Sequence, residues 1–295
     1  MSGGGVILVN PHSGPEETSP DDVAAVFPGS SVRELDGKEV KQQVVDAIES
    51  MASPAFLAVA GGDGTIRCAA GVVAGTDLAL LPIPAGTRNH FAKEVGIATL
   101  EEAAAAGAGG EVTLIDIGEV NGEAFVNNAN IGAYPRIVKE RDAHVKVKRL
   151  SKQTATLVAT WSQMRSMHKF NVTVDGATTY RAWMVFVGNG KYGTSLFDVG
   201  GRESMVDGLL DVRILRADGR LARLRVIGRL LLGRVDRSAM AEFDAVESIE
   251  LALDRPKVDV ALDGEIVSMT SPLRFRCRAK ALRVLVPPGS DSSED

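Results

Sequence analysis

The stretch that most constrains the fold is residues 56–65, FLAVAGGDGT, in which an apolar run ends in a glycine-rich turn. Leu57–Ala60 have the apolar character of a short buried parallel strand, and an alanine- and valine-rich pattern at helical spacing begins at Gly64. We expect the glycines between them to adopt backbone angles closed to other residues, so that the chain passes close to a ligand. A helix N-terminus after such a turn favours phosphate, and Asp63 is placed to hold Mg²⁺ or to orient a hydroxyl. An ordinary strand-to-helix turn that uses glycine for packing remains the alternative.

Strands and helices are predicted to alternate through the first part of the chain. Apolar runs predict strands at 6–9, 31–35, 57–60 and 78–83, and helical spacing predicts helices at 20–26, 40–51, 64–73, 91–95 and 100–108. Such alternation predicts a doubly wound parallel sheet. Ligands of these sheets bind beyond the carboxyl ends of the strands, and the polar loops 10–14, 61–65 and 84–90 all follow strands. We therefore expect the three loops to converge at one edge of the sheet.

The third loop, PAGTRNH, runs directly into a predicted helix. Arg88 is suited to pairing with phosphate. Asn89 is suited either to capping the helix or to binding a sugar hydroxyl, and its spacing favours capping.

From Glu111 onward, short strand-like segments replace the alternating pattern. They lie at 112–120, 124–130, 171–175, 182–187, 209–215, 249–253, 258–262, 273–277 and 281–286. Turns such as Asp175-Gly176 and Asp263-Gly264 separate several of them. These features predict an antiparallel sandwich or barrel, interrupted by helical insertions near 148–169 and 219–233.

Length, charge and cysteine content limit the possible functions. At 295 residues the chain exceeds the usual size of one domain, so we expect two domains. The 33 basic and 38 acidic residues give a net charge of −5, which argues against nucleic acid as a partner. Cys68 and Cys277 indicate reduced thiols of a cytoplasmic protein rather than a disulfide framework or a metal site. No signal peptide is recognisable, and no apolar stretch reaches the roughly 18 residues of a spanning helix, so membrane contact should be peripheral.

Two segments concentrate positive charge. Residues 136–169 contain nine basic and two acidic residues, a local charge of +7, and residues 219–234 mix arginine with leucine. A solvated helix face explains either segment. An anionic membrane surface, where each Lys or Arg contributes about 1 kcal/mol, is the alternative.

Eight motifs in order resemble one family. They are VILVNPHSG, AVAGGDGT, LLPIPAGTRNHFAKEVG, LIDIGEVNG, NNANIG, VGNGKYG, VDGLLDV and VALDGE. Together they are similar to the diacylglycerol kinase catalytic-domain superfamily of lipid kinases, which includes soluble bacterial diacylglycerol kinases, sphingosine kinases and ceramide kinases. GGDGT alone would be shared with NAD kinases and phosphofructokinases. The resemblance implies an α/β fold with an ATP-binding domain at 1–122, a lipid-binding β-sandwich at 123–289 whose last strand is able to return to the first domain, and a disordered tail at 290–295.

The resemblance also implies roles for individual residues. The ATP phosphates would be held by Asn10, Ser13, Gly61, Gly62, Gly64 and Thr65, and the nucleotide would be approached by Gly86, Thr87 and Asn89. Catalytic carboxylates would be Asp63, Asp116 and Glu265, with Glu265 of the DGE motif as the base. An accessory Mg²⁺ site would involve Asp207, Leu209 and Asp211. Without the family, Asp116 fits a strand-edge hydrogen bond equally well, and the DGE turn fits a surface hairpin.

Two positions depart from the family pattern. His90 replaces the aspartate of a common GTGND motif, so a salt bridge or metal contact that the aspartate would make is not expected here. Val206 replaces the first aspartate of a common DDGLLD motif. We therefore expect the accessory Mg²⁺ site to be weak or absent.

These features together predict a kinase that uses ATP and Mg²⁺ to phosphorylate the hydroxyl of diacylglycerol or a similar lipid, giving phosphatidic acid. The expected setting is the cytoplasm, with transient attachment to an anionic membrane surface, and a homodimer remains open. The alternatives are a kinase for another lipid alcohol such as a sphingoid base, a non-catalytic lipid- or nucleotide-binding homologue, and an NAD kinase if the C-terminal strands hold no lipid cavity.

Overall fold

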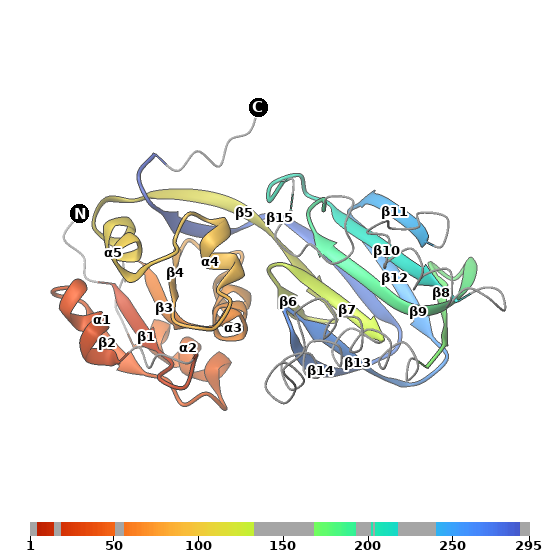
Figure 1. The fold of residues 1–295 in the computed structure, drawn as a ribbon, viewed down its shortest axis with the longest axis horizontal. Helices are drawn as coiled ribbons and strands as arrows, with labels where there is room; N and C mark the ends of the chain where they lie inside the picture. Colours follow the sequence, from red (N-terminus) through yellow and green to blue (C-terminus); the bar gives the residue numbers. More distant parts are fainter. Residues whose placement is uncertain are drawn as a thin grey trace, which may run out of the picture. The chain divides into compact units, whose positions relative to one another are not determined.

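The chain folds into two compact units (Figure 1). The computed structural model describes residues 5–14, 19–50, 56–132, 168–192, 202, 204–217 and 240–289. The first unit comprises residues 1–117, 123–126 and 278–295, and the second comprises 118–122 and 127–277. Two strands, β5 (Glu111–Val120) and β15 (Leu273–Val286), contribute residues to both units.

A parallel sheet forms the centre of the first unit. Its strand order is the last part of β15, β4 (Leu80–Pro84), β3 (Leu57–Gly61), β1 (Val6–Val9) and β2 (Ser31–Glu34). Every residue of β1 and β3 is buried. Because helices cover both faces of such a sheet, its central strands are apolar throughout rather than alternating. The predicted doubly wound parallel sheet is confirmed.

The strand order creates a topological switch point between β1 and β3, and in the described residues five helices connect or flank these strands. The helices are α1 (Pro20–Val26), α2 (Val40–Glu49), α3 (Asp63–Val73), α4 (His90–Glu94) and α5 (Leu100–Gly109). The chain leaves β1 for β2 on one side, then returns past β1 to β3 and β4 on the other. Right-handed crossovers put α1 on one face and α2 and α3 on the opposite face, and α2 contacts α3 whereas α1 contacts α5. Ligands of this fold class bind at such a reversal.

Local sequence signals set the helix boundaries. Ser19 and Asp22 form a capping box at α1, and Thr99 and Glu102 form another at α5. Hydrogen bonds from the Ser19 hydroxyl and backbone N–H lower the pKa of the exposed Asp22 carboxyl. Because the pKa is lowered in the folded state, the ionised Asp22 carboxylate stabilises α1 at pH values above the ordinary aspartate pKa. This stabilisation is lost as the pH falls through the lowered pKa.

Antiparallel strands build the second unit. The main strand order is β14 (Glu265–Thr270), β13 (Lys257–Leu262), β7 (Asn128–Gly132), β9 (Thr178–Asn189), β8 (Phe170–Val174), β12 (Ser248–Leu253) and the first part of β15. β10 (Leu210–Arg216) pairs with β9, and β11 (Met240–Val246) pairs with β10. Because β9 pairs with β7, β8 and β10, the sheet branches there. The predicted antiparallel sandwich is confirmed, with its strands joined through the branch at β9.

Several predicted boundaries are wrong. The single strand expected at 124–130 is two strands, β6 (Glu123–Phe125) and β7, because they belong to different units and pair with different strands. The two strands expected at 273–277 and 281–286 are one continuous β15, in which Lys280 has a φ of 51°. β11 and β14 were not predicted. The helical insertions expected near 148–169 and 219–233 fall outside the described residues, apart from the non-helical 168 and 169.

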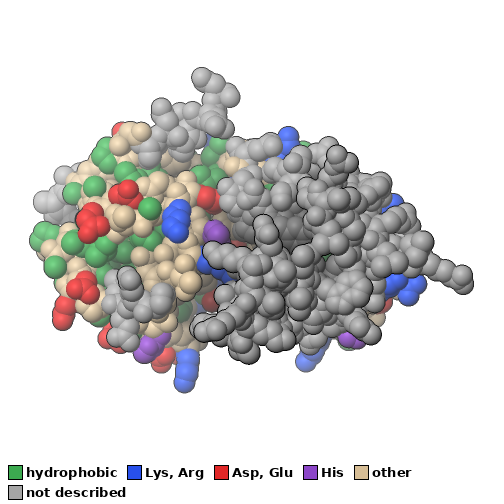
Figure 2. All heavy atoms as spheres, in the orientation of Figure 1, with side chains coloured by type: hydrophobic (Ala, Val, Ile, Leu, Met, Phe, Trp, Pro, Cys, Tyr) green, Lys and Arg blue, Asp and Glu red, His purple; other side chains and the backbone are tan. Residues whose placement is uncertain are grey.

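Charged side chains of both signs are interspersed over the described part of the face shown in Figure 2. Cys68 lies in the first unit and Cys277 in the second, and neither of them is part of a disulfide. Within the described segments, no helix combines the length and the apolar character needed to cross a membrane.

Candidate active site

The loops that follow β1 and β3 are bonded together at the carboxyl edge of the first unit's sheet. The Asn10 backbone N–H donates to the Ala60 carbonyl at 2.9 Å, and Asn10 Nδ2 donates to Thr65 Oγ1 at 3.0 Å. Asn10 and Thr65 are each 8% exposed. Because a buried amide needs hydrogen-bond partners, the side chain of Asn10 ties its loop to the first turn of α3. Contact of Asn10 with phosphate stays a prediction.

Glycines in these loops permit close backbone approach. Gly61, Gly62 and Gly64 have no positive φ, which corrects our expectation that they supply unusual backbone angles. A Cβ on Gly61 would lie 2.6 Å from Thr65 Cβ, and a Cβ on Gly86 would overlap Gly62 Cα. A side chain at Gly61 would push the end of β3 away from the first turn of α3, and a side chain at Gly86 would separate the loops after β3 and β4.

The loop after β1 also reaches the loop after β4. Gly14 has a φ of 96°, and a Cβ there would lie 2.7 Å from the Ala85 carbonyl oxygen. This is a position where glycine is required by backbone angle as well as by space. All three predicted loops therefore meet, as the order of the strands implied.

Asp63 occupies the first position of α3, directly after the N-cap residue Gly62. The first backbone amide that bonds back into the helix is that of Ile66, which donates to the Gly62 carbonyl at 3.1 Å. The amides of residues 63–65 precede it, so they form the anion-attracting end of the helix. Asp63 Oδ1 accepts from the Phe91 amide at 3.3 Å. The half-buried Asp63 thus connects the starts of α3 and α4.

Asn89 does not cap α4 with its side chain, although it occupies the N-cap position. Asn89 Oδ1 accepts from the Gly86 amide at 2.8 Å, and Asn89 Nδ2 donates to the Gly86 carbonyl at 2.9 Å. The side-chain amide of Asn89 thus bonds to both backbone groups of Gly86 within the same turn, and the Asn89 backbone has a φ of 53°. The capping prediction is wrong because the side chain bonds backward to the loop.

The other loop residues vary in exposure. Ser13 is half-buried and its amide donates to the Asn10 carbonyl at 3.2 Å. Thr87 is exposed, and His90 is the half-buried first residue of α4. The structure thus brings the predicted nucleotide residues onto one sheet edge, while their contacts with a nucleotide remain predictions.

Asp116 holds a strand in place. It is 1% exposed on β5, and its Oδ1 accepts from the Lys280 amide at 2.7 Å. Lys280 is the residue of β15 with a left-handed backbone, so this bond stabilises an irregular point of the strand. The strand-edge interpretation of Asp116 therefore has direct support, and its catalytic role stays a prediction.

Glu265 begins β14 in the second unit, on the hairpin formed by Asp263 and Gly264. Both turn residues have positive φ, 48° and 93°, as a two-residue type I′ hairpin requires. Asp263 Oδ1 accepts from the amides of Asn127 and Asn128 at 2.8 and 2.9 Å. Asp263, which the sequence identified only as a turn residue, therefore attaches this hairpin to the start of β7. The hairpin carries Glu265, which is exposed.

The predicted metal ligands lie in the loop before β10 and at the start of that strand, and each is bonded within the second unit. Asp207 accepts from the amides of Leu209 and Lys191 at 3.0 and 3.3 Å. The Leu209 carbonyl accepts from the Gly190 amide at 2.9 Å. Asp211 is 1% exposed and forms an ion pair with Arg213. Across the described residues, no group of three or more His, Cys, Asp or Glu side chains is placed to hold a metal ion.

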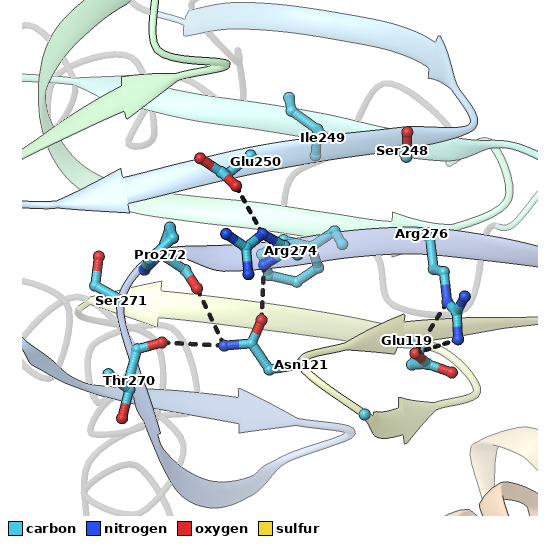
Figure 3. Close-up of a pocket in the computed structure, with 12 residues that line it drawn as sticks. Glu119, Asn121, Ser248, Ile249, Glu250, Thr270, Ser271, Pro272, Arg274 and Arg276 are labelled. Carbon is cyan, nitrogen blue, oxygen red and sulfur yellow. Dashed lines mark hydrogen bonds and ion pairs between the residues drawn. The ribbon is translucent and has the colours of Figure 1, made fainter.

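A cavity of about 680 Å³ lies elsewhere on the second unit (Figure 3). Arg274 Nε and Arg276 Nε donate to Glu250 and Glu119 at 2.8 and 2.9 Å. Asn121 bonds to the backbone at Thr270, Pro272 and Arg274. None of the predicted site residues lines this cavity, and its cations are paired, so we assign it no part in the reaction.

Comparison with known proteins covers both units. Residues 5–120 match the diacylglycerol kinase catalytic domain, and residues 136–286 match the YegS C-terminal NAD kinase beta sandwich-like domain. A protein of Pseudomonas putida assigned as a YegS-like lipid kinase is 31% identical over 244 residues, which are 78% of this chain and 76% of that protein. An uncharacterised protein of Synechocystis is 27% identical over 261 residues, 85% of this chain, and the match spans only 59% of that relative.

The structural comparison agrees. The crystal structure of a Bacillus anthracis protein assigned as a diacylglycerol kinase superposes with a TM-score of 0.69 at 25% identity, over 97% of this chain and 96% of that one. These matches confirm the resemblance that the eight motifs indicated. The chain belongs to the YegS-like family of lipid kinases, with a catalytic domain of the diacylglycerol kinase type.

Proposed function

We propose that this lipid kinase transfers the γ-phosphoryl group of ATP to the hydroxyl of a diacylglycerol-like lipid, giving phosphatidic acid. The observation that carries the proposal is the meeting of three loops and the N-terminus of α3 at the switch point of the first unit. Phosphoryl transfer depends mainly on positioning and charge stabilisation, and both are properties of such a backbone site.

The phosphates would bind at the start of α3. The amides of residues 63–65 precede the first intrahelical bond, and the helix dipole favours negative charge there. Gly62 and Gly86 approach each other without intervening side chains, so the backbone itself can contact the nucleotide.

Asp63 fits a Mg²⁺ ion that accompanies the nucleotide. One carboxylate oxygen accepts from the Phe91 amide, which orients the group, and carboxylate oxygen is a ligand that Mg²⁺ prefers. When bound, Mg²⁺ neutralises charge on the phosphate oxygens. Asp63 therefore has two tasks in our proposal, holding α4 and binding the metal.

The acceptor hydroxyl must lose a proton as it attacks, and a carboxylate base contributes about 10²–10⁴-fold to such a step. We assign this role to Glu265, which is exposed at the start of β14. The hairpin that carries it is anchored by two bonds from amides to Asp263. Asp263 would then be a positioning residue for the base.

We also propose transient contact with an anionic membrane surface through the basic segments 136–169 and 219–234. Lys169, the basic residue of these segments that the structure describes, donates to the Ala217 carbonyl at 3.2 Å and lies 5.4 Å from the Trp183 ring centre. Lys169 therefore has an internal role, and the remaining basic residues would make the contact. A homodimer is compatible with the proposal and is not required by it.

Incubation with labelled ATP and a panel of lipids in mixed micelles, followed by lipid extraction, tests the proposal. We expect label in phosphatidic acid, and its loss in Asp63→Asn protein purified in the same way excludes a contaminating kinase. Label confined to a phosphorylated sphingoid base would replace the acceptor by that alternative. A parallel incubation with NAD, analysed in the aqueous phase, tests the remaining alternative, because label in NADP would indicate NAD kinase activity. A folded protein that labels neither a lipid nor NADP would be a non-catalytic homologue.

A further inference from the structure

Two loops of the second unit are joined through a buried cation that belongs to the chain itself. Loop 189–192 begins at the last residue of β9, and loop 204–211 includes the first two residues of β10. We call Tyr192, Asp211 and Arg213 together the Arg213 clamp. The side chains of Asp211 and Arg213 are 1% and 8% exposed. An ion pair this deeply buried must satisfy its remaining hydrogen-bonding capacity locally.

The geometry of the clamp meets that requirement. Arg213 Nε donates to Asp211 Oδ1 at 2.9 Å, and Arg213 Nη2 donates to Asp211 Oδ2. The same Nη2 donates to the Tyr192 carbonyl at 2.7 Å, while the Tyr192 amide donates to Asp211 Oδ2 at 3.1 Å. The Asp211 carboxylate therefore binds the backbone N–H of Tyr192, and the Arg213 guanidinium binds its carbonyl.

Tyr192 is fixed at its other end as well. Its hydroxyl donates to the Asn127 carbonyl at 2.8 Å, and its ring packs edge-on against Phe186 with ring centres 5.2 Å apart. A Cβ on Gly188 would lie 2.5 Å from the Tyr192 ring, so glycine is needed beneath it. The clamp is thus built into the sheet rather than resting on its surface.

A metal ion that bridged these loops would need oxygen ligands that are free to turn toward it. Asp211 is already neutralised by a guanidinium, whose planar fork matches a carboxylate. The Leu209 carbonyl accepts from Gly190, and Val206 offers no side-chain oxygen. A second cation beside Asp211 would also be repelled by Arg213. Both carboxylate oxygens of Asp207 already accept from backbone amides, those of Leu209 and Lys191. Among the described residues, the ligands that the family resemblance implied therefore do not fit an accessory Mg²⁺ site.

We infer that Arg213 takes the place of the accessory metal ion, so that loops 189–192 and 204–211 are held by the chain's own cation and need no divalent metal. This inference rests on the contacts within the second unit and is independent of the proposed substrate. Taken together with the proposed function, it means that the enzyme's Mg²⁺ requirement is that of the nucleotide alone.

Thermal unfolding of the nucleotide-free chain tests the inference directly. The parent and Asp207→Asn are each melted in EDTA and in increasing concentrations of Mg²⁺, continued well above roughly 10⁻³ M, the dissociation constant of the weakest protein Ca²⁺ sites. We expect Mg²⁺ to change the melting temperatures of the two proteins by the same amount, which can be zero. If Asp207 is not a ligand, any Mg²⁺ that binds the chain binds away from Asp207, and the substitution does not alter its effect. A saturable stabilisation of the parent that Asp207→Asn loses would overturn the inference.

Arg213→Met provides the complementary test, with Arg181→Met on the neighbouring strand β9 as its matched control, since Arg181 is exposed. Removing the guanidinium leaves Asp211 buried and unpaired, so we expect Arg213→Met to melt earlier and to gain a Mg²⁺-dependent stabilisation that Arg181→Met lacks. A folded Arg213→Met protein that melts like the control in both buffers would overturn the assignment. If Arg213→Met does not fold, the comparison of the parent with Asp207→Asn decides.

Discussion

Replacing Gly86 by alanine should force apart two of the loops that form the proposed nucleotide site. The added Cβ would overlap Gly62 Cα and would lie 2.8 Å from Asn89 Oδ1 and 3.2 Å from the Gly62 amide nitrogen. Two of these neighbours are backbone atoms, so no side-chain rotation relieves the clash. Overpacking of this kind costs about 1–3 kcal/mol, and we expect the free energy of unfolding of the first unit to fall by that amount.

Gly62→Ala is the matched control on the opposite side of the same contact. Its Cβ would lie 3.6 Å from Gly86 Cα, an ordinary van der Waals distance, and its backbone has a φ of −79° and a ψ of 176°, which alanine adopts freely. The gain of about 0.4–1 kcal/mol from restricting the unfolded chain is offset by the poorer N-cap preference of alanine. We therefore expect little net change in stability.

Denaturant unfolding of both variants without nucleotide separates the steric effect from any effect on binding. The expected result is a lower midpoint for Gly86→Ala at an unchanged m-value, with Gly62→Ala close to the parent. Equal stability of the two variants would refute the close approach of the loops. A larger loss in Gly62→Ala than in Gly86→Ala would show that the helix cap, rather than the loop contact, dominates at this edge.

Further predictions concern single side chains of the proposed site. Asp63→Asn should weaken Mg²⁺·ATP binding, measured by titration calorimetry, with little change in stability, because the asparagine side-chain oxygen can still accept from the Phe91 amide; unchanged binding would remove Asp63 from the metal site. Glu265→Gln should lower kcat by about 10²–10⁴-fold with little change in ATP affinity; retention of most of kcat at saturating lipid would transfer the base role to Asp63 or Asp116. Asp263→Asn keeps the size of the side chain and removes the charge that strengthens its two bonds with the Asn127 and Asn128 amides, so stability should fall by about 1–3 kcal/mol; a kcat effect in Asp263→Asn that is absent when Glu265 is already Gln would confirm that Asp263 acts through Glu265. Vesicle binding should rise with anionic lipid and fall with salt, as the Debye length shrinks from about 10 Å at 0.1 M to about 3 Å at 1 M; equal binding to neutral vesicles would show that the basic segments are solvated faces.

Sequence patterns predicted the first unit well because parallel strands buried on both faces are short apolar runs with polar loops at fixed ends. They failed where local character was ambiguous. β14, with sequence EIVSMT, is exposed or half-buried at all but one position, so it lacks the alternation that marks a half-buried strand. Lys280 interrupts the apolar pattern of β15 without ending the strand, because Asp116 supports its left-handed backbone.

The site shows the same division. The roles that we propose for Asp63 and the glycine loop follow from the order of strand, turn and helix, which is local information. The partners of Asp263 are 135 and 136 residues away along the chain, and no pattern in one sequence reveals them. The Asp211 and Arg213 pair was within reach, since residues two apart on a strand share a face, and the strand at 209–215 had been predicted.

The path of β15 has a consequence for how this enzyme can be made and divided. Its last residues pair in parallel with β4, with Val284 opposite Leu80, so the first unit receives an outer strand only after the whole second unit has been synthesised. Until then, β4 presents an unpaired edge, which is the kind of surface that recruits other chains. A fragment ending at residue 122 would keep that edge permanently. We expect such a fragment to aggregate and a peptide spanning residues 278–289 to prevent the aggregation. The cause would be the missing edge strand rather than a weakly packed core.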